Sequence, residues 1–199
     1  SNAVEATFSY ALTSDNAGYI VTCTNKTTCT VANIPATYNG KPVLEMVNNT
    51  FQNNSVLTSV SLPNGFKKIA YGAFRSCTSL TTVNIPSSVT FIGGYAFYKT
   101  LVEEIVVPAT CITIESNAFR EAAALKKLTI NANITTLEGN VCNKCPNLET
   151  VTISANMKYM GYDPFDSSIF CTPNLKTVYC RAVLPPIVYN NGGTDNPSF

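Results

Sequence analysis

Two cysteines in a C-x-x-C motif are the first residues whose spacing could do chemistry. Cys142 and Cys145 have the arrangement that elsewhere supports thiol–disulfide exchange or supplies half of a zinc site. The sequence contains no second C-x-x-C and no histidine, so nothing completes a four-ligand site. Whether this pair is reactive or packs inside the protein is decided by the elements that carry it.

Acidic side chains form the second group with candidate chemistry. Glu103 and Glu104, with Glu115 or Glu121, are the candidates for the carboxylate pair of a glycoside hydrolase. No feature of the sequence brings them to a common pocket, and a solvated strand edge and turn account for them. The lack of histidine also removes the commonest general base and metal ligand. We therefore predict no catalytic residues and no enzyme activity.

A calcium loop is the remaining candidate for a metal site. The segment Asp163-Pro164-Phe165-Asp166 carries two carboxylates, but it lacks the alternating acidic ligands that calcium loops use. We therefore expect no metal and no cofactor.

Cys23 and Cys29 flank a short turn at Asn25-Lys26. If the flanking segments are paired strands, the two thiols could face each other. A disulfide between them is a hypothesis that a secreted protein would permit.

The composition describes a neutral, hydroxyl-rich surface. Charged residues make up 13% of the 199 residues, about half of the usual share. The net charge is +1 and the charges are not clustered, which argues against nucleic acid and anionic membranes as partners. No apolar run reaches the ~18–20 residues of a membrane span. Such a surface is more typical of secreted or cell-surface proteins than of cytosolic enzymes.

The first three residues, Ser1-Asn2-Ala3, are typical of the scar that tag cleavage leaves. The lack of a visible signal peptide therefore says nothing about the compartment.

Columns of apolar residues recur every 22 or 23 residues and organise the rest of the chain. The anchor column holds Phe51, Phe74, Phe97, Phe119, Cys142 and Phe165. The strand columns hold Leu57/Val60/Leu62, Leu80/Val83/Ile85, Val102/Ile105/Val107, Leu125/Leu128/Ile130, Leu148/Val151/Ile153 and Leu175/Val178/Cys180. A last pair of columns holds Val43/Met46, Phe66/Ile69, Val89/Ile92, Cys111/Ile114, Ile134/Leu137 and Met157/Met160.

This spacing predicts a β solenoid. The last two residues of each Leu-x-x-Val-x-Ile unit alternate, so they face inward from a short strand. Strands that recur once per repeat must run parallel, stacked about 4.8 Å apart. Proline follows the strand at Pro63, Pro86 and Pro108, where the ladder of backbone hydrogen bonds ends. The prediction is about six parallel-stacked repeats of ~23 residues.

This pattern divides the chain into three segments. Residues 1–33 hold the tag scar and an N-terminal antiparallel β cap, with strands around Phe8–Leu12 and Tyr19–Cys23. Residues 34–182 hold the repeats. The third repeat is one residue short around Thr100-Leu101, and the sixth carries about four extra residues in 166–173. Residues 183–199 form a C-terminal cap and tail.

The repeat register also predicts where the two cysteines of the C-x-x-C motif lie. Cys142 occupies the anchor column, and Cys145 occupies the column of Cys77. Cys111 and Cys180 fall in inward columns as well. We therefore predict that these cysteines are small buried hydrophobes rather than reactive thiols.

The repeat resembles the BspA-like class of leucine-rich repeat. The closest stretch runs from Phe74 to Phe97, with Ile85-Pro86, Val89, Ile92-Gly93 and Ala96-Phe97 in the positions of that pattern. The resemblance covers residues 31–182. It implies a leucine-rich-repeat solenoid on a secreted or surface protein, and members of this family are implicated in adhesion to host proteins or other cells. It implies no catalytic residue and names no ligand.

The outward side of the strands is the surface we predict to bind a partner, because it forms one continuous face in a repeat stack. The threonines and serines on it also suit exposed strands for structural reasons alone. The predicted partner-binding residues are Ser59, Ser61, Thr82, Asn84, Glu104, Val106, Lys127, Thr129, Thr150, Thr152, Thr177 and Tyr179.

The function that we predict is a non-enzymatic secreted or cell-surface binding or adhesion module. Its partner would be a host matrix or cell-surface protein, with a glycan as an alternative ligand. Two other hypotheses remain: a structural spacer that displays another domain, and a carbohydrate-binding protein. The absence of tryptophan and histidine counts against the latter.

Overall fold

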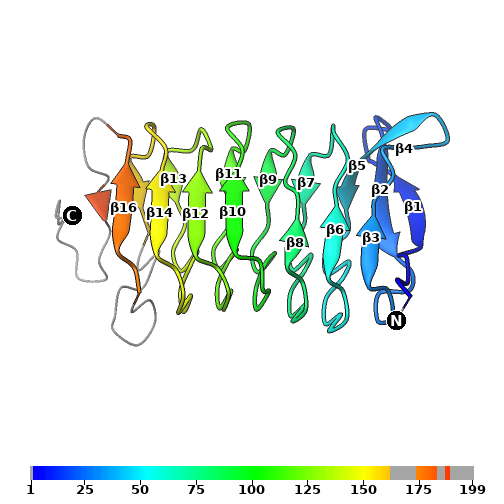
Figure 1. Cartoon of the computed structure of the whole chain (residues 1–199). Helices are drawn as coiled ribbons and strands as arrows, with labels where there is room; N and C mark the ends of the chain where they lie inside the picture. Colours follow the sequence, from blue (N-terminus) through cyan, green and yellow to red (C-terminus); the bar gives the residue numbers. More distant parts are fainter. Residues whose placement is uncertain (1, 162–173, 183–186, 189–199) are drawn as a thin grey trace.

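A computed structural model describes residues 2–161, 174–182 and 187–188 of the chain. The predicted solenoid is confirmed: short parallel strands stack rung upon rung into an elongated body, with the N-terminus at one end (Figure 1). The predicted anchor at Phe165 and the extra residues at 166–173 lie outside the described residues, as do the candidate calcium loop and Cys171.

One line of strands carries the Leu-x-x-Val-x-Ile units. Every pair in it is parallel, and equivalent residues of successive repeats are direct neighbours. We call the outward side of this line the strand face. Its strands are β3 (Val31–Asn33), β6 (Ser59–Ser61), β8 (Thr82–Val83), β10 (Glu104–Val107), β12 (Lys127–Ile130), β14 (Thr150–Ile153) and β16 (Thr177–Cys180).

The strand face is divided into two sheets. Strands β3, β6 and β8 form one sheet, and β10, β12, β14 and β16 form the other. The division falls at the repeat that is one residue short, where the Leu101 N–H donates to the Leu80 carbonyl over 2.9 Å. This backbone hydrogen bond links the two sheets on the strand face, while pairing continues without a break between β9 and β11 on the other side.

A second line of strands runs along the other side of the solenoid (Figure 1). It holds the last pair of apolar columns, to which the sequence analysis assigned no strand. The first sheet of this line holds β5 (Lys41–Met46), β7 (Lys68–Ile69), β9 (Phe91–Ile92) and β11 (Thr113–Ile114), and the second holds β13 (Thr136–Leu137), β15 (Tyr159–Met160) and β17 (Ile187–Val188).

The N-terminal cap is an antiparallel hairpin, as predicted. Strand β1 (Phe8–Leu12) pairs with β2 (Tyr19–Cys23), and β2 then pairs in parallel with β5. The hairpin thus covers the first rung of the second line, which would otherwise expose unpaired backbone groups. Strand β3 lies within the expected cap but already pairs in parallel with β6. The short β4 (Thr37–Tyr38) pairs antiparallel with β5.

Within the predicted C-terminal cap, β17 pairs in parallel with β15. Residues 183–186 and 189–199 lie outside the described residues.

Stacked phenylalanines form the centre of the core. Phe51, Phe74, Phe97 and Phe119 are fully buried, and the ring centroids of successive members are 5.4–5.7 Å apart. The smaller Cys142 continues the column and is also fully buried. Ala73, Ala96 and Ala118, each preceding an anchor, are buried without exposed surface. The small side chain lets the backbone turn against the core at these positions.

The turns that carry the anchors form a third side, which we call the turn face. They stack through backbone hydrogen bonds such as Phe74 N–H to the Ala96 carbonyl and Phe97 N–H to the Ala118 carbonyl, both 2.8 Å. Each turn also contains two left-handed residues. The first of them is Asn49, Gly72, Tyr95, Asn117 or Asn140 in successive repeats, with φ between 56° and 63°.

The phenylalanine column generates a stability prediction. Phe74→Ala removes a fully buried ring that packs against Phe51 on one side and Phe97 on the other. We expect it to lower the free energy of unfolding by about 3–5 kcal/mol, measured by urea titration with circular dichroism. The exposed Thr82→Ala on the strand face is the control, with a change within ~0.5 kcal/mol. Equal effects of the two substitutions would contradict the assignment of the column to the core.

Buried thiols generate a prediction about alkaline stability. Burial raises the pKa of Cys77 from 9.0 to about 12, and its Sγ donates to the Phe51 carbonyl at 3.0 Å. The unfolded chain therefore loses this proton at a lower pH than the folded protein does. The contribution of Cys77 to stability is complete below the unfolded pKa and is lost as pH rises toward the folded one.

The expected loss is about 1.4 kcal/mol per pH unit for this one group. In urea titrations from about pH 9 to 11, Cys77→Ala should show a pH slope that is shallower than that of the unmodified protein by this amount. Parallel slopes would show that the Cys77 thiol does not resist ionisation in the fold.

Candidate functional site

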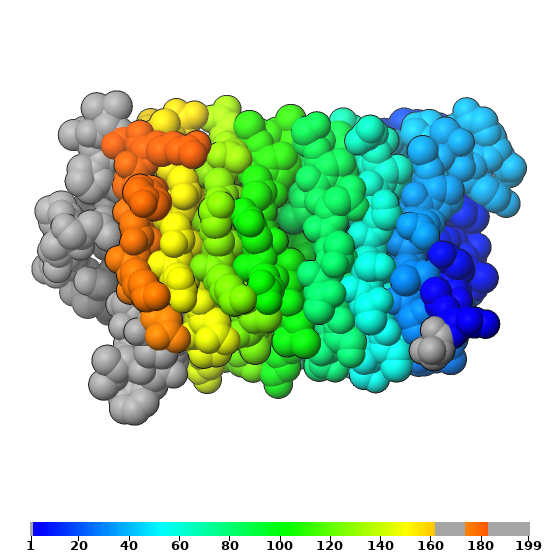
Figure 2. All heavy atoms as spheres, in the orientation of Figure 1, coloured from blue at the N-terminus to red at the C-terminus, as the bar shows by residue number. Residues whose placement is uncertain are grey.

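The strand face brings most of the predicted residues into two straight rows. Glu104, Lys127, Thr150 and Thr177 are successive cross-strand neighbours in one row. Val106, Thr129, Thr152 and Tyr179 are successive neighbours in the other. Figure 2 shows this side of the molecule as adjoining bands of side chains, one band per rung.

Glutamate–lysine pairs bridge neighbouring rungs of the strand face. Lys127 Nζ is 2.9 Å from Glu104 Oε1, and Lys126 Nζ is 3.0 Å from Glu103 Oε2. All four side chains are about half exposed or more, and exposed pairs of this kind contribute little to stability, about 0–1 kcal/mol. Their charges are therefore available to a partner at small cost to the fold.

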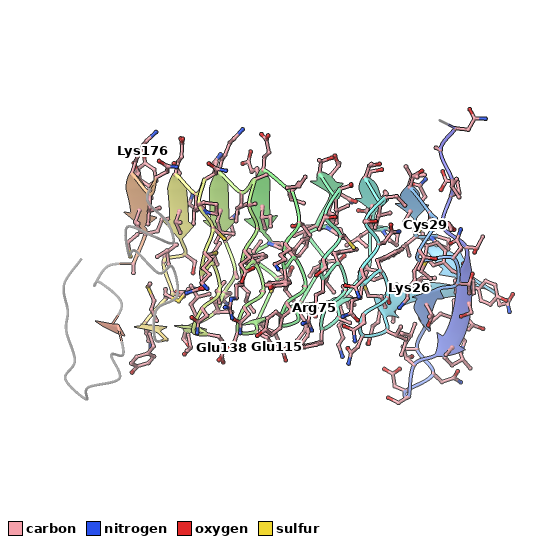
Figure 3. The ribbon with its side chains drawn as sticks, turned by 90° about the horizontal axis from the view of Figure 1, so that it is seen from below. Lys26, Cys29, Arg75, Glu115, Glu138 and Lys176 are labelled. Atoms are coloured by element: carbon pink, nitrogen blue, oxygen red, sulfur yellow. The ribbon has the colours of Figure 1, made fainter. Side chains whose placement is uncertain are left out.

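These pairs also settle where the candidate catalytic carboxylates lie. Glu103 and Glu104 point out beside lysines of the strand face, whereas Glu115 follows β11 in the second line. Figure 3 places Glu115 on the side of the solenoid away from Lys176, which precedes β16. The structure thus separates Glu115 from Glu103 and Glu104, and Glu121 forms ion pairs with Lys99 and Arg120.

Two large apolar side chains are exposed in the second row. Tyr179 is 59% exposed and Val106 is 45% exposed. Between them, Thr129 is partly exposed, but Thr152 is only 8% exposed. The prediction that Thr152 is available on the surface is therefore wrong, because this threonine is covered within the sheet between its neighbours.

In the first sheet of the strand face, some polar residues are exposed and others hydrogen-bond to the backbone. Ser61 and Thr82 are exposed, and Ser59 is partly buried. Asn84 follows β8, and its side-chain amide makes two hydrogen bonds with the backbone of Leu62. Asn84 Oδ1 accepts from the Leu62 N–H at 2.8 Å, and Asn84 Nδ2 donates to the Leu62 carbonyl at 2.9 Å. Asn84 thus closes the end of the neighbouring rung.

The C-x-x-C cysteines lie in the core, as the register predicts. Cys142 and Cys145 are fully buried, and Cys145 Sγ donates to the Phe119 carbonyl at 3.1 Å. Burial raises the pKa of Cys142 well above its ordinary value, which disfavours the reactive thiolate. Cys77 and Cys111 are also buried, whereas Cys180 is exposed. The prediction of a buried Cys180 is wrong, because β16 is the last described strand of its sheet.

Cys23 and Cys29 are brought together, as their hypothesised pairing requires. Both are buried free thiols, with Sγ atoms 3.8 Å apart. Burial raises the pKa of Cys29 to about 12, and the neighbouring Cys23 adds to this effect. Asn54 donates to the Cys29 carbonyl at 2.9 Å and holds this end of the pair in place. The disulfide itself stays a prediction.

The turn face carries an aromatic cluster that sequence reasoning missed. The rings of Tyr71 and Tyr95 meet edge to face with centroids 5.8 Å apart, and those of Tyr95 and Tyr98 do so at 5.6 Å. The Arg75 guanidinium lies over Tyr95 at 5.2 Å and over Tyr98 at 5.7 Å. These tyrosines are not repeated from rung to rung. The only sequence signal was their position beside the anchors Phe74 and Phe97.

In residues 2–161, 174–182 and 187–188, no three His, Cys, Asp or Glu side chains converge as a metal site would require. The same part of the chain contains no helix of sufficient length and apolarity to cross a membrane.

The thiol pair gives a direct chemical test. After oxidation with excess oxidised glutathione, the unreduced protein should lose the mass of two hydrogen atoms, and peptide mapping should join Cys23 to Cys29. The oxidant accepts the two electrons and two protons and is reduced to two thiols. Cys23→Ser should abolish the mass loss, whereas Cys180→Ser should leave it unchanged. Two free thiols after this treatment would reject the disulfide.

Comparisons with known proteins agree with this architecture. The family described as BspA type leucine rich repeat region matches in six copies over residues 45–172. A leucine-rich repeat protein of T. pallidum, TpLRR, has a similar structure, with a TM-score of 0.76 and 23% identity over 87% of this chain and 79% of that one. No curated protein matches the sequence.

Two larger proteins share the fold over part of their length. A leucine-rich repeat protein of Bacteroides ovatus has a TM-score of 0.62 and 18% identity over 92% of this chain, which spans 58% of that one. The pneumococcal vaccine antigen PcpA has a TM-score of 0.58 and 19% identity over 86% of this chain, which spans 49% of that one. Because the family match covers more than half of the sequence and coincides with the stacked rungs, the chain belongs to the BspA-type leucine-rich repeat family.

Proposed function

We propose that the protein is a non-enzymatic binding module that recognises a protein partner through β10, β12, β14 and β16 of the strand face. The observation that carries this proposal is the row that runs from Val106 to Tyr179 across four paired strands. It combines the exposed side chains of Val106 and Tyr179 with the partly exposed hydroxyl of Thr129 on a continuous, hydrogen-bonded sheet. A surface that strand pairing already orders loses little conformational entropy when it binds.

The chemistry of the two rows suits a protein surface. Tyrosine is enriched among the residues that dominate binding energy at interfaces, and Tyr179 is the most exposed aromatic ring of the strand face. The parallel row of Glu104, Lys127 and their neighbours supplies both signs of charge beside it. Charges at the edge of an interface steer association and set specificity more than they add affinity.

We also propose that the protein acts outside the cell or at its surface. The low content of charged residues and the abundance of hydroxyl side chains support this location. Its membership of the BspA-type family supports it as well.

A polar hollow supports a glycan as a second candidate ligand. It measures about 730 Å³ and lies where the chain leaves β10, β12, β14 and β16. In this hollow Asn131, Ser154 and Arg181 take the positions that proline holds in earlier repeats. Arg181 Nη1 donates to Asn131 Oδ1 at 3.1 Å, and Ser154 Oγ is buried without a hydrogen-bond partner among the described residues. Amide, hydroxyl and guanidinium groups can bond sugar hydroxyls.

To test the protein-binding proposal, the protein is screened for binding to a panel of host matrix proteins and cells. The affinity for each partner found is then measured. We expect Lys127→Ala with Tyr179→Ala to weaken binding at least about tenfold, since residues that dominate interfaces cost about 2 kcal/mol or more. The matched control is Lys144→Ala with Tyr71→Ala on the turn face.

Three outcomes decide between the candidates. Loss of binding in the strand-face variant alone supports the proposal. Loss in the turn-face variant alone contradicts the choice of surface. Absence of any protein hit, together with glycan-array binding that Arg181→Ala abolishes, would overturn the protein partner in favour of a sugar.

A further inference from the structure

A small hollow opens on the turn face, away from both the strand face and the polar hollow. It measures about 350 Å³ and is lined by Tyr71 and Tyr95, by Glu115 and Glu138, and by Gly94, Ser116 and Asn117. This volume is at the lower end of the range of small-ligand sites, about 300–1,000 Å³. Two aromatic rings and two carboxylates in one hollow are an unusual combination in a chain with so few charges.

The four side chains that give this hollow its chemistry all depart from the repeat. Glu115 and Glu138 follow β11 and β13, at a position that Ala70 and Gly93 occupy in the preceding repeats. Tyr71 occupies a position that holds Gly94, Ser116 and Gly139 in the next three repeats. Small residues fill both positions in several repeats, so the scaffold does not require these larger ones.

Tyr95 departs from the repeat in a way that costs energy. Its φ is 56°, and the equivalent residues of the other turns are Asn49, Gly72, Asn117 and Asn140. Asparagine and glycine tolerate the left-handed region, whereas a bulky aromatic residue there is rare. The tyrosine is therefore held in a conformation for which the repeat elsewhere selects asparagine or glycine.

The backbone positions the two rings against each other. Atoms Cδ2 and Cε2 of Tyr71 lie so close to Gly94 that a Cβ added there would be 3.4 Å from each. The Tyr71 and Tyr95 ring planes are 66° apart with centroids 5.8 Å apart, so they form a corner. Tyr71 remains 37% exposed, which leaves its ring accessible to a ligand.

Two carboxylates belong to the lining of the hollow, and one guanidinium, that of Arg75, lies over the Tyr95 ring at 5.2 Å. Glu115 and Glu138 lie next to each other on the side away from Lys176, with Arg75 farther along the same side (Figure 3). Glu115 Oε2 accepts the Gly94 N–H at 2.7 Å, and Glu138 Oε2 accepts the Ser116 hydroxyl at 3.3 Å. Neither has a basic partner within ion-pair distance in the described part of the chain, unlike Glu103, Glu104, Glu121 and Glu149.

From these contacts we propose that the hollow binds a substituted ammonium group. The exposed Tyr71 ring is its main aromatic wall, Tyr95 forms the corner and already carries the Arg75 guanidinium over its ring, and Glu115 and Glu138 are the counter-charges. The faces of aromatic rings attract cations, and quaternary ammonium groups suit them because their methyl groups cover the charge and are weakly hydrated. The carboxylates supply long-range attraction without needing the direct hydrogen bonds that a bare ammonium would demand. This site is independent of the proposed protein-binding surface.

The probe is choline chloride, titrated into the whole protein and followed by amide NMR shifts of Gly94, Ser116 and Asn117. The matched neutral molecule is 3,3-dimethylbutan-1-ol, which has the shape of choline without its charge, and sodium chloride controls for ionic strength. We expect saturable shifts with choline, but not with the neutral alcohol or with sodium chloride. A parallel titration with Nε-trimethyllysine shows whether a free small molecule or a modified protein side chain fits better; tighter binding of either supports the site.

Three variants make the test specific. Tyr95→Asn restores the residue type of the other repeats, so it should fold, while weakening choline binding about threefold or more. Glu138→Gln removes one charge with little change of shape and should weaken choline binding similarly. Tyr179→Asn on the strand face should leave it unchanged. Equal binding of the neutral alcohol, unaltered affinity in folded Tyr95→Asn, or no saturable shift with either ammonium probe would overturn the proposal.

Discussion

The stacking of buried phenylalanines at one residue per rung is the constraint on which the rest of the structure depends. Phe51, Phe74, Phe97 and Phe119 touch their neighbours along the axis, so each repeat must return its anchor to the same place. A repeat that is one residue short meets this requirement only by giving up strand pairing between β8 and β10. The phenylalanine column therefore stays continuous, whereas the sheet of the strand face is interrupted.

This constraint separates the chain into positions that build the scaffold and positions that are free to vary. The inward columns, the alanines beside the anchors and the left-handed turn residues are scaffold. Val106 and Tyr179 on one side, and Tyr71 and Tyr95 on another, are not required by the repeat. Function in such a protein is therefore to be sought in side chains that differ between otherwise equivalent rungs.

The sequence predicted the scaffold well, because apolar periodicity reports burial directly. It gave the parallel stack, the hairpin at the start and the buried Cys142 and Cys145. It missed the second line of strands, since all of them after β5 are only two residues long and leave little alternation to detect. It also missed the tyrosine cluster, because these residues do not recur and their proximity depends on how the rungs stack. The burial of Thr152 and exposure of Cys180 likewise depend on neighbouring rungs.

The proposed function requires a protein partner to contact the outward residues of β10, β12, β14 and β16. Hydrogen–deuterium exchange on a complex captured from host matrix or cell-surface proteins tests it most directly. We expect added protection in peptides that cover residues 104–107, 127–130 and 177–180, with no change in the turn at residues 93–99. Protection confined to the turn or to the second line of strands would contradict it.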